Sequence, residues 1–444
     1  MSADYAVPSS SPLESDARAT MTDHTVAPGE IAIGVVIGRA AEYFDFFVYG
    51  IASVLIFPGV FFPFASPVQG TIYAFALFAL AFIARPIGTA IFMEIDRRHG
   101  RGAKLTIALF LLGGSTAAIA FLPNYTQIGA LSIWLVAAFR VGQGLALGGA
   151  WDGLASLLAL NAPEGRKGWY AMMPQLGAPI GFLLASALFA FFLSNLTRED
   201  FLDWGWRYPF YVAFAINVVA LFARLRLVAT EEFVRMLDMH ELDPTPVHQV
   251  VRVHGRDILI GAFVPLASFA LFHLVTIFPI SWITLFTQRS SSEFLMVQFA
   301  GAIVAAGGIV ASGLFADQIG RRTTVAISAS LIGVFAIGSI IAPILIGDSS
   351  AGQTIYVIVG FGLLGLSYGQ TSGSVTANFG SRYRYTGAAL TADLAWLIGA
   401  AFAPLVALSV SSEFGLAWVG VYLLSGAVCT LAALSINRRA SRTA

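Results

Sequence analysis

The chain has 444 residues, of which 57% are hydrophobic and only 11% are charged, and its mean hydropathy is +0.78. This composition lies outside the range of soluble globular proteins and is typical of a polytopic membrane protein. The 25 basic residues balance the 25 acidic ones, which argues against a nucleic-acid binder. The single cysteine, Cys429, excludes an internal disulfide, a cysteine zinc site and an iron–sulfur cluster.

Residues 1–30 are polar and include a run of three serines at 9–11. They have neither the apolar run nor the charged start of a cleavable signal, so they are predicted to form a disordered cytoplasmic tail.

The remainder contains windows of about 20 apolar residues, each long enough to cross a bilayer as a helix. They lie near 31–57, 68–93, 105–123, 126–151, 168–194, 208–228, 258–286, 294–316, 323–347, 351–378, 385–410 and 414–436. Long apolar runs favour helices over the short alternating strands of a membrane barrel. An all-α fold with twelve transmembrane helices is predicted.

A polar interval at 229–257 separates six spans from six. It predicts an N-terminal bundle over 31–228, a cytoplasmic loop, a C-terminal bundle over 258–437 and a cytoplasmic tail over 438–444. The segments 88–101 and 313–322 are similar, which indicates a parallel repeat. Most Lys and Arg residues fall in the loops on one side, so both termini are expected in the cytoplasm. Two repeated six-helix bundles with a site between them are typical of an alternating-access carrier.

Six motifs in order resemble the metabolite:proton symporter family of the major facilitator superfamily. They are EYFDFFVYG at 42–50, ARPIG at 84–88, RVGQGLALGG at 140–149, PQLGAPIG at 174–181, WGWRYPF at 204–210 and RYRYTGAAL at 382–390. The resemblance implies the two-bundle fold and proton-coupled transport. Two departures affect gating or coupling: Asp96 and Arg97 stand where the family usually has Gly and Asp, and Ala150 replaces a usual glutamate, with Asp152 two positions later.

Several ionisable residues lie within the predicted spans. They are Arg39, Glu42, Asp45, Arg85, Arg140 and Asp393. Each costs about 2.5–3.5 kcal/mol near a helix centre unless it is paired or hydrated. At 100° per residue, Arg39, Glu42, Asp45 and Tyr49 share an arc of about 120°, so this face of the first span is predicted to line the cavity.

Two interpretations of the acids remain open. In one, Glu42 or Asp45 exchanges a proton between the two sides while an arginine modulates it, and the family resemblance favours this. In the other, Arg39 and Glu42 only neutralise each other, and Asp45 caps a neighbouring helix or pairs with Arg85 or Arg140.

Charge balance suggests the substrate. In the first bundle three arginines exceed the two acids by one charge, which favours an anion, and the planar fork of Arg140 suits a carboxylate. The predicted substrate-binding residues are Arg39, Tyr49, Arg140, Gln143, Gln175, His273, Gln370 and Asp393. For some, a structural role stays open: His273 as a core residue, Gln370 at a loosely packed helix end, and Asp393 as a partner of Arg382 or Arg384.

Charged residues next to span ends are predicted to form latches that hold the cytoplasmic side shut. They are Arg85, Asp96, Arg97, Arg101, Asp317, Arg321 and Arg322. The alternative is that the arginines only anchor the loops on the cytoplasmic side.

No residues have the spacing of a metal site, a catalytic triad or a phosphate-binding loop, so an enzyme is not expected, and no cofactor or metal beyond the proton gradient is predicted. The predicted protein is a monomeric, multi-pass secondary transporter of the bacterial plasma (inner) membrane. Its predicted activity is proton-coupled uptake of a small organic acid anion, such as a di- or tricarboxylate or an aromatic acid. The alternatives are a betaine or amino-acid symporter, a proton-driven efflux carrier, and a transport-dead sensor or assembly factor.

Overall fold

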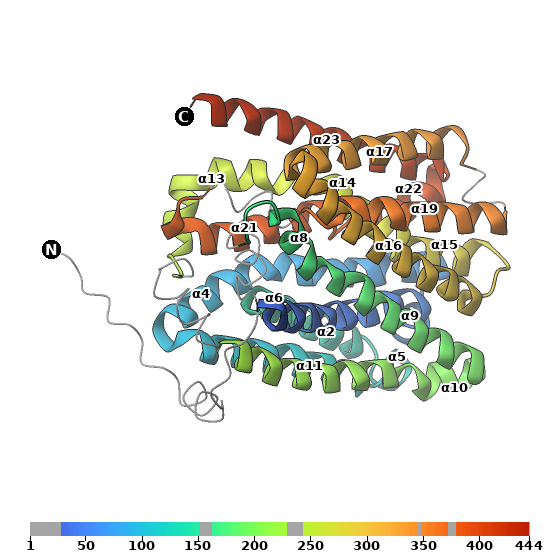
Figure 1. Cartoon of the computed structure of the whole chain (residues 1–444). Coiled ribbons are helices and arrows are strands. Elements are labelled where there is room, and N and C mark those ends of the chain that lie inside the picture. Colours follow the sequence, from blue (N-terminus) through green and yellow to red (C-terminus); the bar gives the residue numbers. More distant parts are fainter. Residues whose placement is uncertain (1–27, 151–161, 229–242, 344–348, 372–378, 444) are drawn as a thin grey trace.

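The computed structural model describes residues 28–150, 162–228, 243–343, 349–371 and 379–443, and within these ranges every regular element is a helix. Most helices run along one common direction, with the first half of the chain on one side and the second half on the other (Figure 1). Of the two altered positions in the fourth span, Ala150 is described and is buried at the end of α6, whereas Asp152 lies outside the described ranges.

The helices of the first half are α2 (Pro28–Leu55), α3 (Phe57–Phe61), α4 (Pro67–Ala120), α5 (Tyr125–Ile128), α6 (Leu131–Gly149), α8 (Lys167–Met172), η1 (Met173–Leu176), α9 (Gly177–Asn195), α10 (Arg198–Asp200), η2 (Phe201–Gly205) and α11 (Arg207–Val228). Those of the second half are α13 (Val247–Phe263), α14 (Leu266–Val275), α15 (Ile277–Phe286), α16 (Ser291–Ile319), α17 (Arg321–Ile341), α19 (Ser350–Tyr368), α21 (Ser381–Gly399), α22 (Ala403–Phe414) and α23 (Ala417–Thr443).

The predicted number of membrane spans is confirmed. Nine helical segments in the described ranges have the length and hydropathy of a span. One of them, α4, has 54 residues and holds two spans, because about 20 residues suffice for one. Gly100, with φ of 82°, marks the junction between the two. With α2 and α11, which are also long enough, the total is twelve.

The seventh span is broken twice. Pro265 has no backbone N–H and its ring disfavours a continuing helix, so α13 ends at Phe263 and α14 begins at Leu266. A second break at Thr276 separates α14 from α15. Helix α13 already begins at Val247, inside the interval predicted as a loop.

Glycines bring pairs of helices into backbone contact in both halves. A Cβ on Gly144 of α6 would lie 2.3 Å from the carbonyl oxygen of Ala81 of α4. In the second half, a Cβ on Gly365 of α19 would lie 2.2 Å from the carbonyl oxygen of Ala305 of α16. Small residues at these positions let the helices approach this closely. The same contact therefore occurs between the second and fourth spans and between the eighth and tenth.

The molecule has two ends along the helix direction. One, here named the α13 end, carries α13 and the C-terminus, and the other carries α10 and α5 and is named the α10 end (Figure 1). The halves meet along α9 and α16, and along α4 and α21.

Candidate functional site

A narrow cavity lies between the two halves. It consists of two adjoining parts of about 40 Å³ and about 50 Å³ that share Arg39, Arg85 and Trp396. One water molecule needs roughly 10–15 Å³ of cavity volume, so this cavity has room for only a few waters. A metabolite would fit only if the two halves moved apart. The remaining lining residues include Glu42, Tyr43, Phe46, Phe82, Arg140 and Leu147 in one part and Gln175, Phe269, Tyr368, Thr371, Ala388 and Ala395 in the other.

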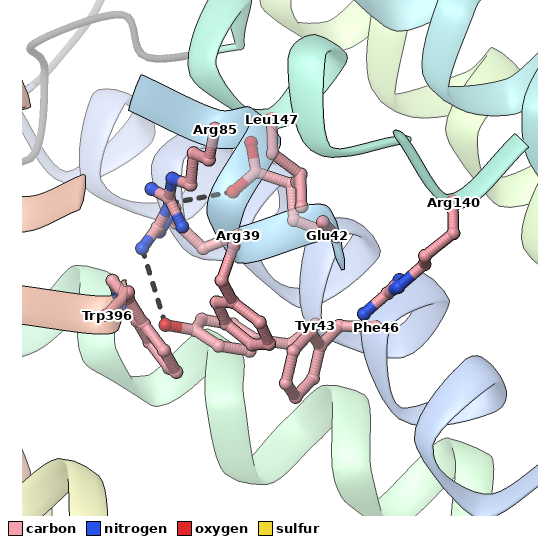
Figure 2. Close-up of a pocket in the computed structure, with 10 residues that line it drawn as sticks. Arg39, Glu42, Tyr43, Phe46, Arg85, Arg140, Leu147 and Trp396 are labelled. Carbon is pink, nitrogen blue, oxygen red and sulfur yellow. Dashed lines mark hydrogen bonds and ion pairs between the residues drawn. The ribbon is translucent and has the colours of Figure 1, made fainter. Parts of the chain in front are cut away.

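Arg39 and Glu42 form an ion pair at the cavity wall, with Nη1 and Oε2 2.7 Å apart (Figure 2). Arg39 Nη2 also donates to the hydroxyl of Tyr43 at 3.4 Å. That hydroxyl is hydrogen-bonded to the hydroxyl of Tyr368 from the opposite half. These contacts agree with the interpretation in which Arg39 and Glu42 neutralise each other.

Arg140 is held by neutral groups. Its Nε and Nη2 both donate to the carbonyl oxygen of Phe78 at 3.2 Å, and Nη1 donates to Gln143 Oε1 at 3.0 Å. The guanidinium carbon lies 3.9 Å from the centroid of the Tyr49 ring. Hydrogen bonds and cation–π contact thus fix a fully buried cation at the edge of the cavity.

Asp45 is linked to Arg140 through a chain of hydrogen bonds inside the first half. Thr116 donates to Asp45 Oδ1 at 2.7 Å, and Gln143 Nε2 donates to the Thr116 hydroxyl at 2.8 Å. Since Gln143 also accepts from Arg140, the chain runs from a cation to a carboxylate through two neutral side chains.

The expectation that one face of the first span lines the cavity is partly wrong. Arg39 and Glu42 line it, whereas Asp45 and Tyr49 do not. Asp45 lies about 120° from Arg39 around the helix axis, at the edge of the predicted arc, and this turns it toward Thr116 on α4. Gln143 is likewise buried behind the cavity wall.

An ion pair joins the halves beside the cavity. Arg85 Nε of α4 lies 2.6 Å from Asp393 Oδ1 of α21, and the hydroxyl of Thr89 donates to the other carboxylate oxygen. Asp393 was expected to bind substrate or to pair with Arg382 or Arg384. Its bonds to α4 instead place it with Arg85 in a contact between the halves.

A second cross-contact lies nearer the α13 end. Tyr385 of α21 donates to Asp96 Oδ2 at 3.3 Å and accepts from Lys104 at 2.7 Å. Arg101 also contacts Asp96, at 3.4 Å, and its guanidinium lies over the Tyr385 ring. Burial opposes ionisation of Asp96, yet Arg101, Lys104 and Tyr385 together hold the pKa of its carboxyl below the usual range. These four residues, Asp96, Arg101, Lys104 and Tyr385, form what we name the tyrosine latch.

Asp317 makes a third cross-contact. Its two carboxylate oxygens accept from the backbone N–H groups of Gly168, at 2.6 Å, and Trp169, at 3.2 Å, in the first turn of α8. Gln370 donates to the carbonyl oxygen of Gly168 at 3.2 Å. Gln370 was predicted in the substrate site, but it lies in this contact and not among the residues that line the cavity.

The other predicted latch residues have partners in their own half. Arg97 pairs with Glu94 at 2.7 Å, and hydrogen bonds from Arg97 and Arg98 lower the pKa of Glu94 to about 2. Arg322 donates to the carbonyl oxygen of Leu434, and Arg321 interacts electrostatically with Asp317.

His273 is enclosed by aromatic rings. The centroids of Phe78, Phe272 and Phe46 lie 5.4, 5.4 and 5.8 Å from that of the imidazole. Neither ring nitrogen has a hydrogen-bond partner among the described residues, and the side chain is fully buried. His273 thus lies near the cavity without lining it, whereas Gln175 does line it.

Several residues of the candidate site were not predicted. Tyr43, Phe46 and Trp396 line the cavity, and Thr116 and Tyr385 make the polar contacts described above. Aromatic residues in apolar spans look like core residues, so only the three-residue spacing of Tyr43 and Phe46 along α2, beside Glu42, could have indicated them.

Comparison with known proteins identifies the family. The model of the Major Facilitator Superfamily matches residues 35–393. The inner membrane metabolite transport protein YhjE of Escherichia coli (strain K12) is 35% identical over 95% of this chain and 98% of its own. The shikimate transporter of the same strain is 30% identical, covering 91% and 92%. The proline/betaine transporter of Salmonella typhimurium (strain LT2) is 28% identical, covering 91% and 83%.

Among solved structures, the D-xylose–proton symporter has the same fold, with a TM-score of 0.69 at 18% identity over 90% of this chain and 97% of that one. This likeness of fold is consistent with the twelve spans counted here. These relatives are transport proteins and not enzymes, and such carriers need no cofactor. The chain is a multi-pass membrane transporter that belongs to the major facilitator superfamily.

Proposed function

We propose that this protein is a proton-coupled symporter that takes up a small metabolite bearing a carboxylate. It works as a monomer in the bacterial inner membrane, with the α13 end and both termini in the cytoplasm. The names of its relatives support this substrate class, because shikimate, proline and betaine all carry a carboxylate. An inner membrane relative and the concentration of Lys and Arg in loops of one side support the location and orientation.

The observation that carries the proposal is the hydrogen-bond chain from Asp45 to Arg140. Arg140 borders the cavity, and its planar guanidinium suits a carboxylate. When Asp45 takes up a proton, the negative charge that offsets Arg140 is removed, and the attraction of Arg140 for an anion rises. Binding of the proton therefore strengthens binding of the substrate, and binding of the substrate strengthens binding of the proton, which is the requirement for symport.

Contacts at the α13 end support transport by alternating access. The tyrosine latch and the bonds of Asp317 to α8 join the halves there. They hold that side shut while the α10 side opens, and they break when the bundles rock the other way.

The test is uptake by proteoliposomes under an imposed inward proton gradient. The probes are shikimate, benzoate, succinate and glycine betaine. Wild-type protein is expected to accumulate at least one of them against its gradient. Asp45→Asn mimics the protonated acid, so it should lose accumulation and keep exchange of labelled for unlabelled substrate. Glu413→Gln, at an exposed acid of α22, is the matched control and should keep both.

The outcomes separate the candidates. Accumulation by Asp45→Asn at the wild-type level removes Asp45 from coupling and directs the same test to Glu42→Gln. Uptake of glycine betaine without the anions would favour the betaine symporter, which the proline/betaine relative suggests. Proton-driven loss of preloaded substrate would indicate efflux, and no movement of any probe would indicate a transport-dead protein.

A further inference from the structure

Asp393 is an acid in the second half whose two oxygens are both bound by the first half. Arg85 Nε lies 2.6 Å from Oδ1, and Thr89 donates to Oδ2. The residue is 2% exposed, so water does not compete for these bonds. The Asp393 carboxylate therefore occupies Arg85 and Thr89 of α4 in the way that the carboxylate of a bound ligand would.

Arg85 is also a cavity residue, because it lines both parts of the cavity. A substrate carboxylate entering this space would meet the Arg85 guanidinium if Asp393 were absent. With Asp393 in place, the charge of Arg85 is already offset.

The other two arginines of the cavity differ from each other. Arg39 has a carboxylate partner in Glu42, at 2.7 Å. Arg140 has only neutral hydrogen-bond partners among the described residues, and Asp45 is separated from it by two side chains. Three guanidinium groups thus border the cavity, two have a carboxylate in contact, and one is left to attract an external anion.

The Arg85–Asp393 pair joins the same two helices, α4 and α21, as the tyrosine latch. When bundles rock, contacts on the closed side persist while the opposite side opens. A substrate that enters from the α10 end therefore finds Arg85 still paired.

We propose that Asp393 sets the charge of the substrate: it serves as a built-in carboxylate for Arg85, so the site accepts a metabolite with one carboxylate and discriminates against one with two. A second substrate carboxylate would be buried without a cation of its own, which is costly in a low-dielectric site. The inference rests on the proposed function, because it assumes a substrate recognised through a carboxylate.

The experiment measures binding to the full-length purified protein by thermal shift and isothermal calorimetry. The probes are two size-matched pairs that differ by one carboxylate, butyrate with succinate and benzoate with phthalate. The reported quantity is the ratio of dicarboxylate to monocarboxylate affinity within a pair. Wild-type protein is expected to favour the monocarboxylate at least tenfold.

Asp393→Asn keeps the shape of the side chain and removes its charge, so Arg85 becomes available. The affinity ratio should move toward the dicarboxylate by tenfold or more. Asp393→Glu keeps the charge and should keep the wild-type ratio. Tyr385→Phe is the matched control, because it weakens the contact between α4 and α21 without changing a charge in the cavity, and both affinities should change by the same factor.

If Asp393→Asn does not fold, the double variant Arg85→Gln/Asp393→Asn replaces it, because both charges of the pair are then removed together. Its site has the wild-type charge balance, so it should keep the preference for monocarboxylates. The inference is overturned by a wild-type protein that binds both members of a pair equally, by an unchanged ratio in Asp393→Asn, or by a double variant that prefers dicarboxylates. If no carboxylate binds or moves with wild-type protein, the proposed function fails instead.

Discussion

The two halves contribute different chemistry to the same cavity. The first half supplies all three guanidinium groups and Glu42, on α2, α4 and α6. The second half supplies mainly rings and small side chains, namely Phe269, Tyr368, Trp396, Ala388, Ala392 and Ala395. If the cavity is the substrate site, the first half supplies the cations for a charged substrate, whereas the second half shapes the cavity and, through Asp393, offsets one of those cations.

The interiors of the halves differ in the same way. In the first half a chain of hydrogen bonds connects α2, α4 and α6, from Asp45 to Arg140. Across the interface, the second half presents the stacked rings of Phe269 and Trp396, with centroids 4.4 Å apart, and the enclosed His273. Directional bonds tolerate less change than ring packing, so equivalent substitutions should have unequal effects.

The largest effect is expected for Arg140→Lys. Lysine keeps the charge but cannot reproduce the two bonds to Phe78 or the stacking on Tyr49. Hydrogen bonds of a charged group contribute about 1.5–3 kcal/mol, which corresponds to roughly ten- to a hundredfold weaker binding of the acid found in the uptake screen. Calorimetry measures this.

Arg289→Lys is the control for that change, since Arg289 also bonds neutral groups but lies outside the cavity. It should leave the affinity unchanged. Equal affinity in Arg140→Lys and wild type would remove Arg140 from the substrate site and end the division of roles between the halves.

An intermediate effect is expected for Tyr385→Phe, which removes the hydroxyl that bridges Lys104 and Asp96. Losing it should favour opening of the α13 end by about 0.5–1.5 kcal/mol, or roughly two- to tenfold. Labelling of a cysteine placed at Ala388, in a chain with Cys429 replaced by serine, measures this opening. A labelling rate equal to that of the otherwise identical chain with Tyr385 would remove the hydroxyl from the latch.

The tyrosine latch also predicts that opening of the α13 end does not depend on pH near neutrality. Because the pKa of Asp96 is lowered in the folded protein, its stabilising contribution is present above the unfolded pKa, near 3.8, and is lost only as pH falls through the lowered value. The contribution of Asp96 should therefore be constant between pH 5 and pH 8, so the labelling rate should not change with pH because of this residue. A latch that weakens in this window in wild type and not in Asp96→Asn would contradict the assignment.

The smallest effect is expected for His273→Phe. The imidazole has no hydrogen-bond partner among the described residues, so a ring of similar shape should change stability by less than about 1 kcal/mol and leave substrate affinity within about threefold. Thermal unfolding and calorimetry check both. A large loss of affinity would show that His273 meets the substrate once the halves separate, and the second half would then bind the substrate as well as shape the cavity.

Much of the fold could be predicted because hydropathy directly reflects the bilayer. Long apolar runs gave twelve spans, and the similar segments at 88–101 and 313–322 indicated the repeat that the glycine contacts of α6 and α19 display. The helix breaks at Pro265 and Thr276 depend on tertiary packing as well as on proline, and the sequence did not indicate them.

The sequence indicated several charged residues of the candidate site, but not which of them contact one another. An ionisable residue inside a span must be paired or hydrated, so Arg85, Arg140 and Asp393 could be singled out. Which of them meet depends on how two bundles dock, and this is why Asp393 was assigned to the substrate and lies instead on Arg85. The polar neighbours Thr116 and Tyr385 are common residue types whose roles appear only in three dimensions.

The backbone contact between α4 and α6 has a consequence for how new substrates can arise. No side chain larger than hydrogen fits at Gly144, where the two helices touch. The facing surfaces of α4 and α6 therefore tolerate few substitutions. Helix α21 instead meets the cavity through small side chains such as Ala388 and Ala395, which larger ones can replace. Selection in the laboratory for a different metabolite should therefore collect its substitutions on α21 and leave the α4–α6 pair as a fixed scaffold.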